Sequence, residues 1–327
     1  MKIVVLDGYT LNPGDNPWTP VERLGELVIY DRTSPDLILE RAGEADIILT
    51  NKTPLGAGTL EQLPKLQFIS ELATGYNNID VQAAGRLGIP VANVPEYSTV
   101  FVAQHVLALI LSLCNQVAIH DAAVKQGEWA ASPDFAFWKA PFVELAGKTL
   151  GVVGCGKIGG RVARVAQALG MTILAHNPRS RVAPEGVAVQ WTGLEELFAK
   201  SDVVTLHCPL TPENTGFVDS RLLGTMKPTA LLINTARGAL VNERDLADAL
   251  NNGTIAGAAL DVVSVEPIRP ENPLPAARNC IITPHIAWAS PEARRRLMEQ
   301  TAHNIEAFLA GKPVNLVNSD YLATGKK

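Results

Sequence analysis

The chain has 327 residues, of which 47% are hydrophobic and 19% charged, and its formal net charge is −5. This length suits two domains of roughly 100–200 residues each, and the hydrophobic fraction supplies packed cores rather than a disordered chain. The longest basic run is Arg294-Arg295-Arg296, and its helical pattern predicts a solvated face. We therefore expect no nucleic-acid partner.

The four cysteines are scattered, with no CxxC pair and no histidine at ligand spacing. Free buried thiols are typical of a reducing compartment, so we expect a cytoplasmic protein without a disulfide scaffold or a metal site. The chain starts directly as a strand, without a signal-peptide pattern. The most apolar stretch, residues 100–114, is interrupted by Gln104 and His105 and is shorter than the roughly 20 residues of a membrane span. It predicts a buried or interface helix and no membrane partner.

Strand-like runs alternate with helical patterns almost throughout, which predicts parallel βαβ units. A first series of strands is expected at residues 3–6, 27–30, 46–50, 66–71 and 91–93, with helices at 36–42 and 81–86. A long apolar helix then opens at Ser98 or Thr99. A second series of strands is expected at residues 149–154, 172–176, 187–191, 203–207, 231–234, 256–261 and 280–283, with helices at 158–169, 194–199 and 244–251. Ser290 is the expected N-cap of a final helix that stops before Gly311, and the aromatic segment 127–145 predicts a loop.

The motif Gly154-Cys155-Gly156-Lys157-Ile158-Gly159 follows an apolar strand and opens a helix. In that setting the first glycine makes a tight turn and the second lets the backbone approach a pyrophosphate. The third lets helix and strand pack closely. The motif predicts a dinucleotide site, and the alternative is a glycine turn in an ordinary α/β domain.

The next strand ends in His176-Asn177-Pro178-Arg179-Ser180-Arg181, where an NAD-specific site usually carries an acid. Asn177 does not repel a 2′-phosphate. Arg179 and Arg181 can pair with that group, and Ser180 can donate a hydrogen bond to it. We therefore expect NADPH to be preferred over NADH, with NADH still usable. The alternative is a basic turn that only sits in solvent.

Three further residues are candidates for chemistry. Arg237 in Asn234-Thr235-Ala236-Arg237-Gly238 and His285 in Thr283-Pro284-His285 both follow predicted strands, and Glu266 precedes Pro267. Taken singly, each is more often structural. Together they supply an anion clamp, a proton donor near neutral pH and a carboxylate that can hold an imidazolium, as reduction of a 2-keto acid requires.

Over essentially its whole length the chain resembles the D-isomer-specific 2-hydroxyacid dehydrogenases. The resemblance rests on the motifs above together with the run Pro284-His285-Ile286-Ala287-Trp288-Ala289-Ser290. The resemblance implies an α/β fold of two Rossmann-like domains with parallel sheets. A discontinuous, flavodoxin-like substrate domain would take residues 1–98 and 289–327, and an NAD(P)-binding Rossmann domain would take residues 99–288. The resemblance also implies a homodimer held through the long apolar helix.

Residue roles follow from the resemblance. Arg237 would bind the carboxylate and carbonyl of the substrate. His285 would be the acid in reduction and the base in oxidation, and Glu266 would favour its imidazolium form and orient it. Ala73-Thr74-Gly75 resembles the loop that receives the substrate carboxylate. The implied cofactor residues are Gly154, Gly156, Lys157, Ile158, Gly159, Asn177, Arg179, Ser180, Cys208, Pro209, Thr215, Thr235, Ala236 and, on the nicotinamide side, Asp261.

Two stretches point to a subgroup. Residues 73–80, Ala-Thr-Gly-Tyr-Asn-Asn-Ile-Asp, are similar to glycerate dehydrogenases that reduce hydroxypyruvate and glyoxylate. Phe137-Trp138-Lys139 is similar to a mobile loop of glyoxylate/hydroxypyruvate reductases whose tryptophan reaches the neighbouring subunit's site. We therefore expect Trp138 near a substrate site, and a packed core residue is the alternative. Asn177 departs from the Asp that many NAD-dependent members carry.

Two rival functions remain. A phosphoglycerate dehydrogenase often carries an added regulatory domain, for which little length is left here. A non-catalytic NAD(H)-sensing binding protein of the same fold would carry partner-docking extensions, whereas this sequence stops soon after its last predicted helix. Both functions are less favoured than a reductase that acts on small 2-keto acids.

Overall fold

The computed structural model describes residues 1–178 and 180–322, which divide into two compact units. The first unit is Met1–Ser98 together with the chain from Trp288 onward, and the second is Thr99–Ala287. The expected boundary after residue 288 lies one residue beyond this division.

The described part of the first unit is built on a five-stranded parallel sheet with the order β2-β1-β3-β4-β5. Its strands are β1 (Lys2–Val5), β2 (Glu26–Ile29), β3 (Ile47–Thr50), β4 (Phe68–Glu71) and β5 (Val91–Ala92). Its helices are α1 (Thr19–Glu22), α2 (Ile38–Ala42), α3 (Ala57–Leu60), α4 (Val81–Arg86) and α11 (Pro291–Leu309). This strand order is that of flavodoxin-like folds, as the sequence predicted.

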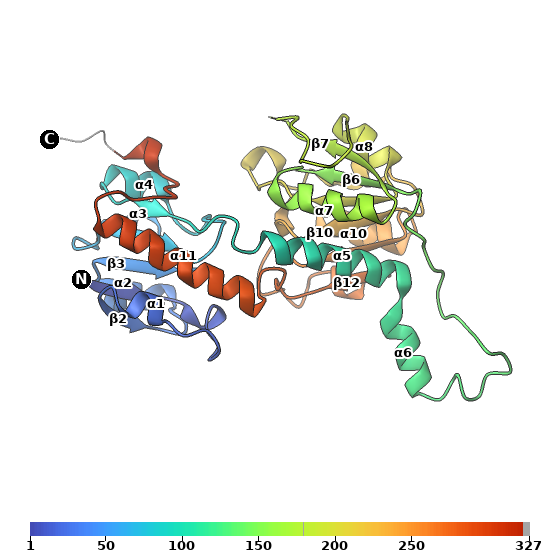
Figure 1. Ribbon diagram of the computed structural model, residues 1–327, viewed down its shortest axis with the longest axis horizontal. Helices are drawn as coiled ribbons and strands as arrows, with labels where there is room; N and C mark the ends of the chain where they lie inside the picture. Colours follow the sequence, from blue (N-terminus) through green and yellow to red (C-terminus); the bar gives the residue numbers. More distant parts are fainter. Residues whose placement is uncertain (179, 323–327) are drawn as a thin grey trace. The chain divides into compact units, whose positions relative to one another are not determined.

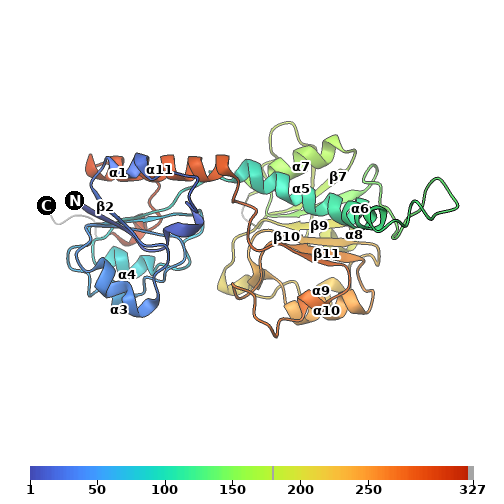
Figure 2. The same cartoon turned by 90° about the horizontal axis from the view of Figure 1, so that it is seen from below.

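Helices cover both faces of this sheet, because alternate side chains of a buried parallel strand point to opposite sides. Figure 2 shows α1 and α11 on one face and α3 and α4 on the other. Ile47 and Leu49 pack in one cluster with Leu297 and Ile305 of α11, whereas Ile48 belongs to the cluster on the opposite face. The expected N-cap of α11 is confirmed.

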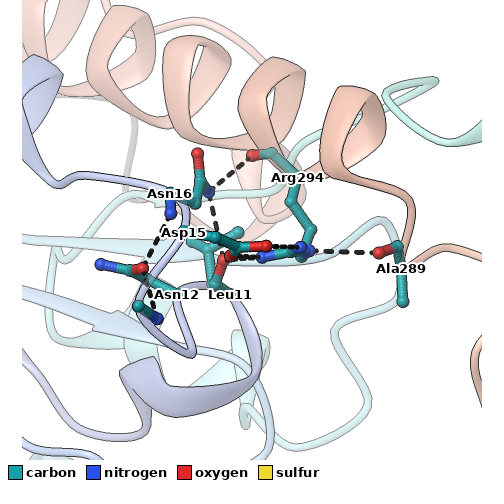
Figure 3. A network of polar contacts seen from close by, with 7 residues as sticks. Leu11, Asn12, Asp15, Asn16, Ala289 and Arg294 are labelled. Atoms are coloured by element: carbon teal, nitrogen blue, oxygen red, sulfur yellow. Dashed lines mark hydrogen bonds and ion pairs between the residues drawn. The ribbon is translucent and has the colours of Figure 1, made fainter.

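The expectation that the three consecutive arginines of α11 form a solvated face is wrong. Arg294 is buried and pairs with both carboxylate oxygens of Asp15, with 2.6 Å between Nη2 and Oδ2, and its Nε donates to the Ala289 carbonyl (Figure 3). Arg296 Nε donates to the Tyr97 carbonyl at 2.8 Å. Successive residues of a helix point about 100° apart, so one run cannot share one face.

The second unit, apart from residue 179, is built on a seven-stranded parallel sheet with the order β12-β11-β10-β9-β6-β7-β8. Its strands are β6 (Thr149–Val153), β7 (Thr172–His176), β8 (Val189–Trp191), β9 (Val203–Leu206), β10 (Leu231–Asn234), β11 (Gly257–Leu260) and β12 (Cys280–Ile282). Its helices are α5 (Thr99–Asn115), α6 (Val117–Lys125), α7 (Lys157–Ala168), α8 (Leu194–Lys200), α9 (Ser220–Leu223) and α10 (Glu243–Asn251). Read from β8, this is the Rossmann order with one further edge strand, which confirms the predicted fold class.

In this unit α5 and α7 cover one face of the sheet and α9 and α10 the other (Figure 2). The apolar residues Val106, Leu109 and Ile110 of α5 are buried in the core, which explains the apolar stretch seen in the sequence. Among the described residues, no single helix is long and apolar enough to cross a membrane. Within the described chain, α5 and α6 meet that test of length and composition only when taken together, as a pair bent by 57°.

Candidate active site

The glycine loop, residues 154–159, connects β6 to α7. Gly154 has φ +94°, and a Cβ there would lie 2.6 Å from the Cys208 amide nitrogen. A Cβ on Gly159 would lie 2.4 Å from the Gly154 carbonyl oxygen, whereas one on Gly156 would meet no atom within 4 Å. The first and third glycines therefore permit close packing, and the second leaves open space in front of the helix.

The first turn of α7 faces this open space. Lys157 and Ile158 begin the helix, which follows Gly156 as its N-cap and runs for 12 residues. The first N–H groups of a helix have no partner within it, and the helix dipole places partial positive charge there. This end of α7 therefore suits a pyrophosphate.

Asn177 follows β7 and is tied to the glycine loop. Its Oδ1 accepts a hydrogen bond from the Cys155 N–H at 2.8 Å, and its Nδ2 lies 3.4 Å from the Cys155 carbonyl oxygen. Ser180 and Arg181 are exposed, and Arg179 lies outside the described residues. A neutral amide thus occupies the position where an NAD-specific site usually carries an acid.

The segment after β9 borders the glycine loop. The backbone nitrogen of Cys208 lies so close to Gly154 that it leaves no room for a Cβ there. Pro209 accepts a hydrogen bond from Asn214 Nδ2 at 2.8 Å, and the exposed Thr215 donates its hydroxyl to the Thr211 carbonyl at 3.1 Å. These residues form one hydrogen-bonded turn at the carboxyl edge of the sheet.

His207 was not singled out by the sequence reasoning, although it directly follows β9 at this same edge. Its Nε2 lies 3.0 Å from Thr205 Oγ1, and a Cβ on Gly159 would come within 3.2 Å of its ring. Burial lowers the pKa of His207 to about 4. The ring is therefore neutral at neutral pH and adds no positive charge beside the glycine loop.

Arg237 lies in the segment that follows β10, and the Asn234 side chain holds the backbone of this segment. Asn234 Nδ2 donates to the Arg237 carbonyl at 2.8 Å, and Asn234 Oδ1 accepts the Ala236 N–H at 3.0 Å. Arg237 Nη1 donates to the Ala236 carbonyl at 2.7 Å. Because Asn234 pairs with Leu260 of β11, the segments after β10 and β11 leave the sheet at the same edge.

Gly238 brings the arginine segment against the segment that follows β11. A Cβ at this position would lie 1.9 Å from the Val263 carbonyl carbon and 2.1 Å from the Val263 carbonyl oxygen. The Val263 N–H in turn donates to Glu266 Oε1 at 3.4 Å. A glycine is therefore needed where the arginine and glutamate segments meet.

His285 and Glu266 are brought together by the turn after β12 and the segment after β11. His285 Nδ1 lies 2.6 Å from Glu266 Oε2, and the two side chains are 28% and 30% exposed. The carboxylate accepts a hydrogen bond from Nδ1–H, so the second ring nitrogen, Nε2, can exchange a proton with a reactant. This arrangement can perform general acid–base chemistry.

Asp261 lies directly behind this pair with its carboxylate fully buried. Its Oδ1 accepts the Ile286 N–H at 2.9 Å, its Oδ2 accepts the Ala287 N–H at 2.8 Å, and its carbonyl accepts the His285 N–H at 2.8 Å. These bonds hold the turn in which His285 adopts φ +53°. A contact of Asp261 with nicotinamide stays a prediction.

The loop expected to receive the substrate carboxylate lies in the first unit, directly after β4. Thr74 Oγ1 donates to the Val94 carbonyl at 2.9 Å, and the Ala73 carbonyl accepts the Val94 N–H at 3.0 Å. Asn93 Nδ2 donates to the Thr74 carbonyl at 2.7 Å, just before Gly75. The loop is thereby fixed at the carboxyl edge of its sheet.

Glu71 lies at the base of this loop, and the sequence reasoning did not single it out either. It is fully buried, its Oε2 accepts Asn78 Nδ2 at 3.1 Å, and within the described structure its Oε1 has no hydrogen-bond partner. Burial, opposed by the Asn78 bond and reinforced by the charge of Asp7, raises the pKa of the Glu71 carboxyl well above its ordinary value. Glu71 is therefore a buried acid that tends to keep its proton.

Trp138 is 70% exposed, so the alternative that it packs in a core is wrong. It lies in the loop after α6, which Figure 1 shows extending away from the body of the second unit. The Lys139 N–H donates to His120 Nε2 at 3.0 Å, and Lys139 Nζ pairs with Glu128 at 2.6 Å. These contacts fasten the tryptophan segment to α6 and to the turn that follows this helix.

Two observations test whether the second unit fits a dinucleotide. The space in front of Gly156 is open, and the Thr235 hydroxyl oxygen, beside Arg237, is buried without a partner among the described residues. Both features fit a bound polar molecule along the carboxyl edge of the sheet. Residues 1–178 and 180–322 contain no group of three His, Cys, Asp or Glu side chains placed to hold a metal ion.

Comparison with known proteins gives a consistent result. The model of the D-isomer specific 2-hydroxyacid dehydrogenase NAD binding domain matches residues 107–287. A hydroxypyruvate reductase of Blautia hydrogenotrophica is 49% identical over 321 residues, covering 97% of this chain and 100% of the relative. A glycerate dehydrogenase of Methylorubrum extorquens is 43% identical over 321 residues, covering 97% of this chain and 99% of the relative.

A solved structure supports the same family assignment. The NADPH-dependent glyoxylate/hydroxypyruvate reductase of Sinorhizobium meliloti, in complex with NADP and malonate, is 29% identical with a TM-score of 0.83. The alignment covers 97% of this chain and 96% of that one. The chain belongs to the D-isomer specific 2-hydroxyacid dehydrogenase family. It is an NAD(P)-dependent oxidoreductase, as the sequence predicted.

Proposed function

We propose that this protein reduces hydroxypyruvate and glyoxylate to D-glycerate and glycolate, with NADPH preferred over NADH. The observation that carries the proposal is the 2.6 Å contact between His285 Nδ1 and Glu266 Oε2, at the same sheet edge as the glycine loop. The names of the relatives that match nearly the whole chain support this choice of substrates.

In this proposal each side chain has a defined task during reduction. The Arg237 guanidinium binds the substrate carboxylate with its planar fork and polarises the 2-keto oxygen. His285 donates its Nε2 proton to that oxygen and keeps its Nδ1 proton, while Glu266 accepts a hydrogen bond from Nδ1–H and stabilises the imidazolium beforehand. When bound, nicotinamide supplies the hydride that goes to C2. In the reverse direction His285 takes the hydroxyl proton back.

The cofactor preference rests on charge at the end of β7. A 2′-phosphate carries nearly two negative charges, which an acid at position 177 would repel and the neutral Asn177 does not. Arg181, exposed in the same turn, can pair with it. A charge-assisted contact contributes about 1.5–3 kcal/mol, reduced by exposure to water, and 1.4 kcal/mol is a factor of ten in binding.

We also propose a cytoplasmic homodimer. Large apolar side chains are exposed along α6 and the following loop, including Val117 at 68%, Phe135 at 92% and Trp138 at 70%. Apolar surface of this kind favours association with a second copy, and Trp138 would then lie near the partner's substrate site. The four free cysteines support a reducing compartment. A solution mass of a single chain would contradict the dimer.

A kinetic panel tests the function. Glyoxylate, hydroxypyruvate, pyruvate and 3-phosphohydroxypyruvate are each assayed with NADPH and NADH, with His285→Ala as the matched inactive control. The highest kcat/KM is expected for hydroxypyruvate or glyoxylate with NADPH. A clear preference for the phosphorylated acid would favour a phosphoglycerate dehydrogenase. No turnover with any acid would favour the nucleotide-sensing alternative.

A further inference from the structure

A row of three hydrogen-bonded side chains lies behind the His285 turn. His105 Nε2, on α5, is 3.1 Å from Thr283 Oγ1, and Thr283 Oγ1 is 2.6 Å from Asp261 Oδ1. Both carboxylate oxygens of Asp261 already accept a backbone N–H, so the threonine hydroxyl is the donor to the carboxylate. Its one proton is then used, and the threonine oxygen accepts from His105. The geometry therefore places a proton on His105 Nε2.

Asp261, at one end of this row, holds the backbone of the turn that carries His285. His285 has φ +53°, a left-handed conformation that costs a residue with a side chain about 1–3 kcal/mol and persists only where its surroundings hold it. Asp261 supplies that hold through the N–H groups of Ile286 and Ala287, which directly follow. The direction of the imidazole toward Glu266 thus depends on where the Asp261 carboxylate lies.

His105 is the remote end of the row. The Asp261 carboxylate has no exposed surface, whereas the His105 side chain is 14% exposed and its Nε2 lies 3.6 Å from Asp261 Oδ1. Without a donor from His105, the partly buried Thr283 oxygen would lose the hydrogen bond that it accepts, and its hydroxyl would be held only by the contact with Asp261. The carboxylate would then lose a fixed partner.

We propose that His105 is a positioning residue for proton transfer by His285. By donating to Thr283 it fixes the Asp261 carboxylate and, through the following turn, the direction of the His285 imidazole. The inference rests on the proposed acid–base role of His285. Because neither His105 nor Thr283 contacts a reactant in this account, their loss affects kcat and leaves both KM values nearly unchanged.

The test compares His105→Leu, which removes the donor, with His105→Gln, which keeps an N–H, using hydroxypyruvate and NADPH. His105→Leu is expected to lower kcat about tenfold, the loss typical of one hydrogen bond, with both KM values within about twofold. His105→Gln is expected to recover most of the rate. Gln104→Ala, an exposed neighbour on α5, is the control and is expected to match the unmodified enzyme.

A double-mutant cycle shows whether the two residues act in one row. Thr283→Val is expected to slow kcat at least as much as His105→Leu, and Thr283→Ser is expected to keep most of it. The double variant His105→Leu/Thr283→Val is expected to be no slower than Thr283→Val alone, since both remove the same interaction. A double variant whose loss of kcat equals the product of the two single losses would overturn the inference. Should His105→Leu fail to fold, equal rates for the two Thr283 variants would overturn it instead.

His285→Ala separates this inference from the proposed function. Full activity of His285→Ala would reject the proposed function itself. An inactive His285→Ala beside a His105→Leu that turns over normally, even with a lowered melting temperature, would reject only the positioning role of His105.

Discussion

Gly238 joins the two halves of the catalytic edge, and Gly238→Ala tests that junction. A Cβ there would lie 1.9 Å from the Val263 carbonyl carbon, whereas real Cβ contacts essentially never fall below 3.0 Å, so the backbone must retreat by about 1.1 Å. The neighbouring atoms are backbone and cannot rotate away. Overpacking of this kind typically costs about 1–3 kcal/mol of stability. A displacement of about 1 Å at reacting groups can lower the rate about 100-fold.

We therefore expect Gly238→Ala to lower the melting temperature and to reduce kcat/KM for hydroxypyruvate about 100-fold, because Arg237 and Glu266 no longer keep their separation. Gly193→Ala is the control, since a Cβ at Gly193 meets no atom within 4 Å. Thermal melting and steady-state kinetics are measured on both variants. A Gly238→Ala enzyme with the melting temperature and kcat/KM of the unmodified protein would refute the reasoning.

Five further variants test other residues of the site and its surroundings. His285→Ala and Arg237→Ala should each lower kcat/KM severely, about 10²–10⁴-fold for the histidine, and ordinary turnover by His285→Ala at every pH would remove it from the mechanism. Glu266→Gln should reduce kcat less and move the pH optimum downward, since the imidazolium loses its carboxylate; an unchanged profile argues against the pairing. Asn177→Asp keeps an acceptor for the Cys155 N–H, removes the 3.4 Å donor to the Cys155 carbonyl and adds a negative charge, so the NADPH/NADH ratio of kcat/KM should reverse, mostly through KM; an unmodified enzyme that prefers NADH would contradict this. Glu71→Gln should gain stability relative to the unmodified protein as pH rises above about 4.5 toward the raised pKa of Glu71, because the unfolded chain ionises first; melting curves that shift in parallel with pH would show otherwise.

The sequence predicted the sheets better than the short helices. Strands such as β7 (Thr172–His176) and β10 (Leu231–Asn234) match the expected bounds, because a buried parallel strand is a continuous apolar run between polar turns. The short helices α1 (Thr19–Glu22) and α3 (Ala57–Leu60) were missed. Four residues are too few to show a helical period.

Side-chain partnerships distant in sequence were the second kind of failure. Arg294 pairs with Asp15 across 279 positions, and a basic run gives no sign of such a partner (Figure 3). The same holds for His105 and Thr283, which are 178 positions apart. The glycine loop was easier to predict because its function needs particular backbone conformations, and these restrict which residues are allowed.

The central claim is that hydride passes from the nicotinamide to C2 of a small 2-keto acid and gives the D-product. The most direct measurement supplies hydroxypyruvate with NADPH deuterated at the transferable position and analyses the glycerate by mass and chirality. The expected product is D-glycerate with one deuterium on C2, formed by the unmodified protein and not by His285→Ala. L-glycerate, or glycerate without deuterium after use of the correctly labelled face, would contradict it.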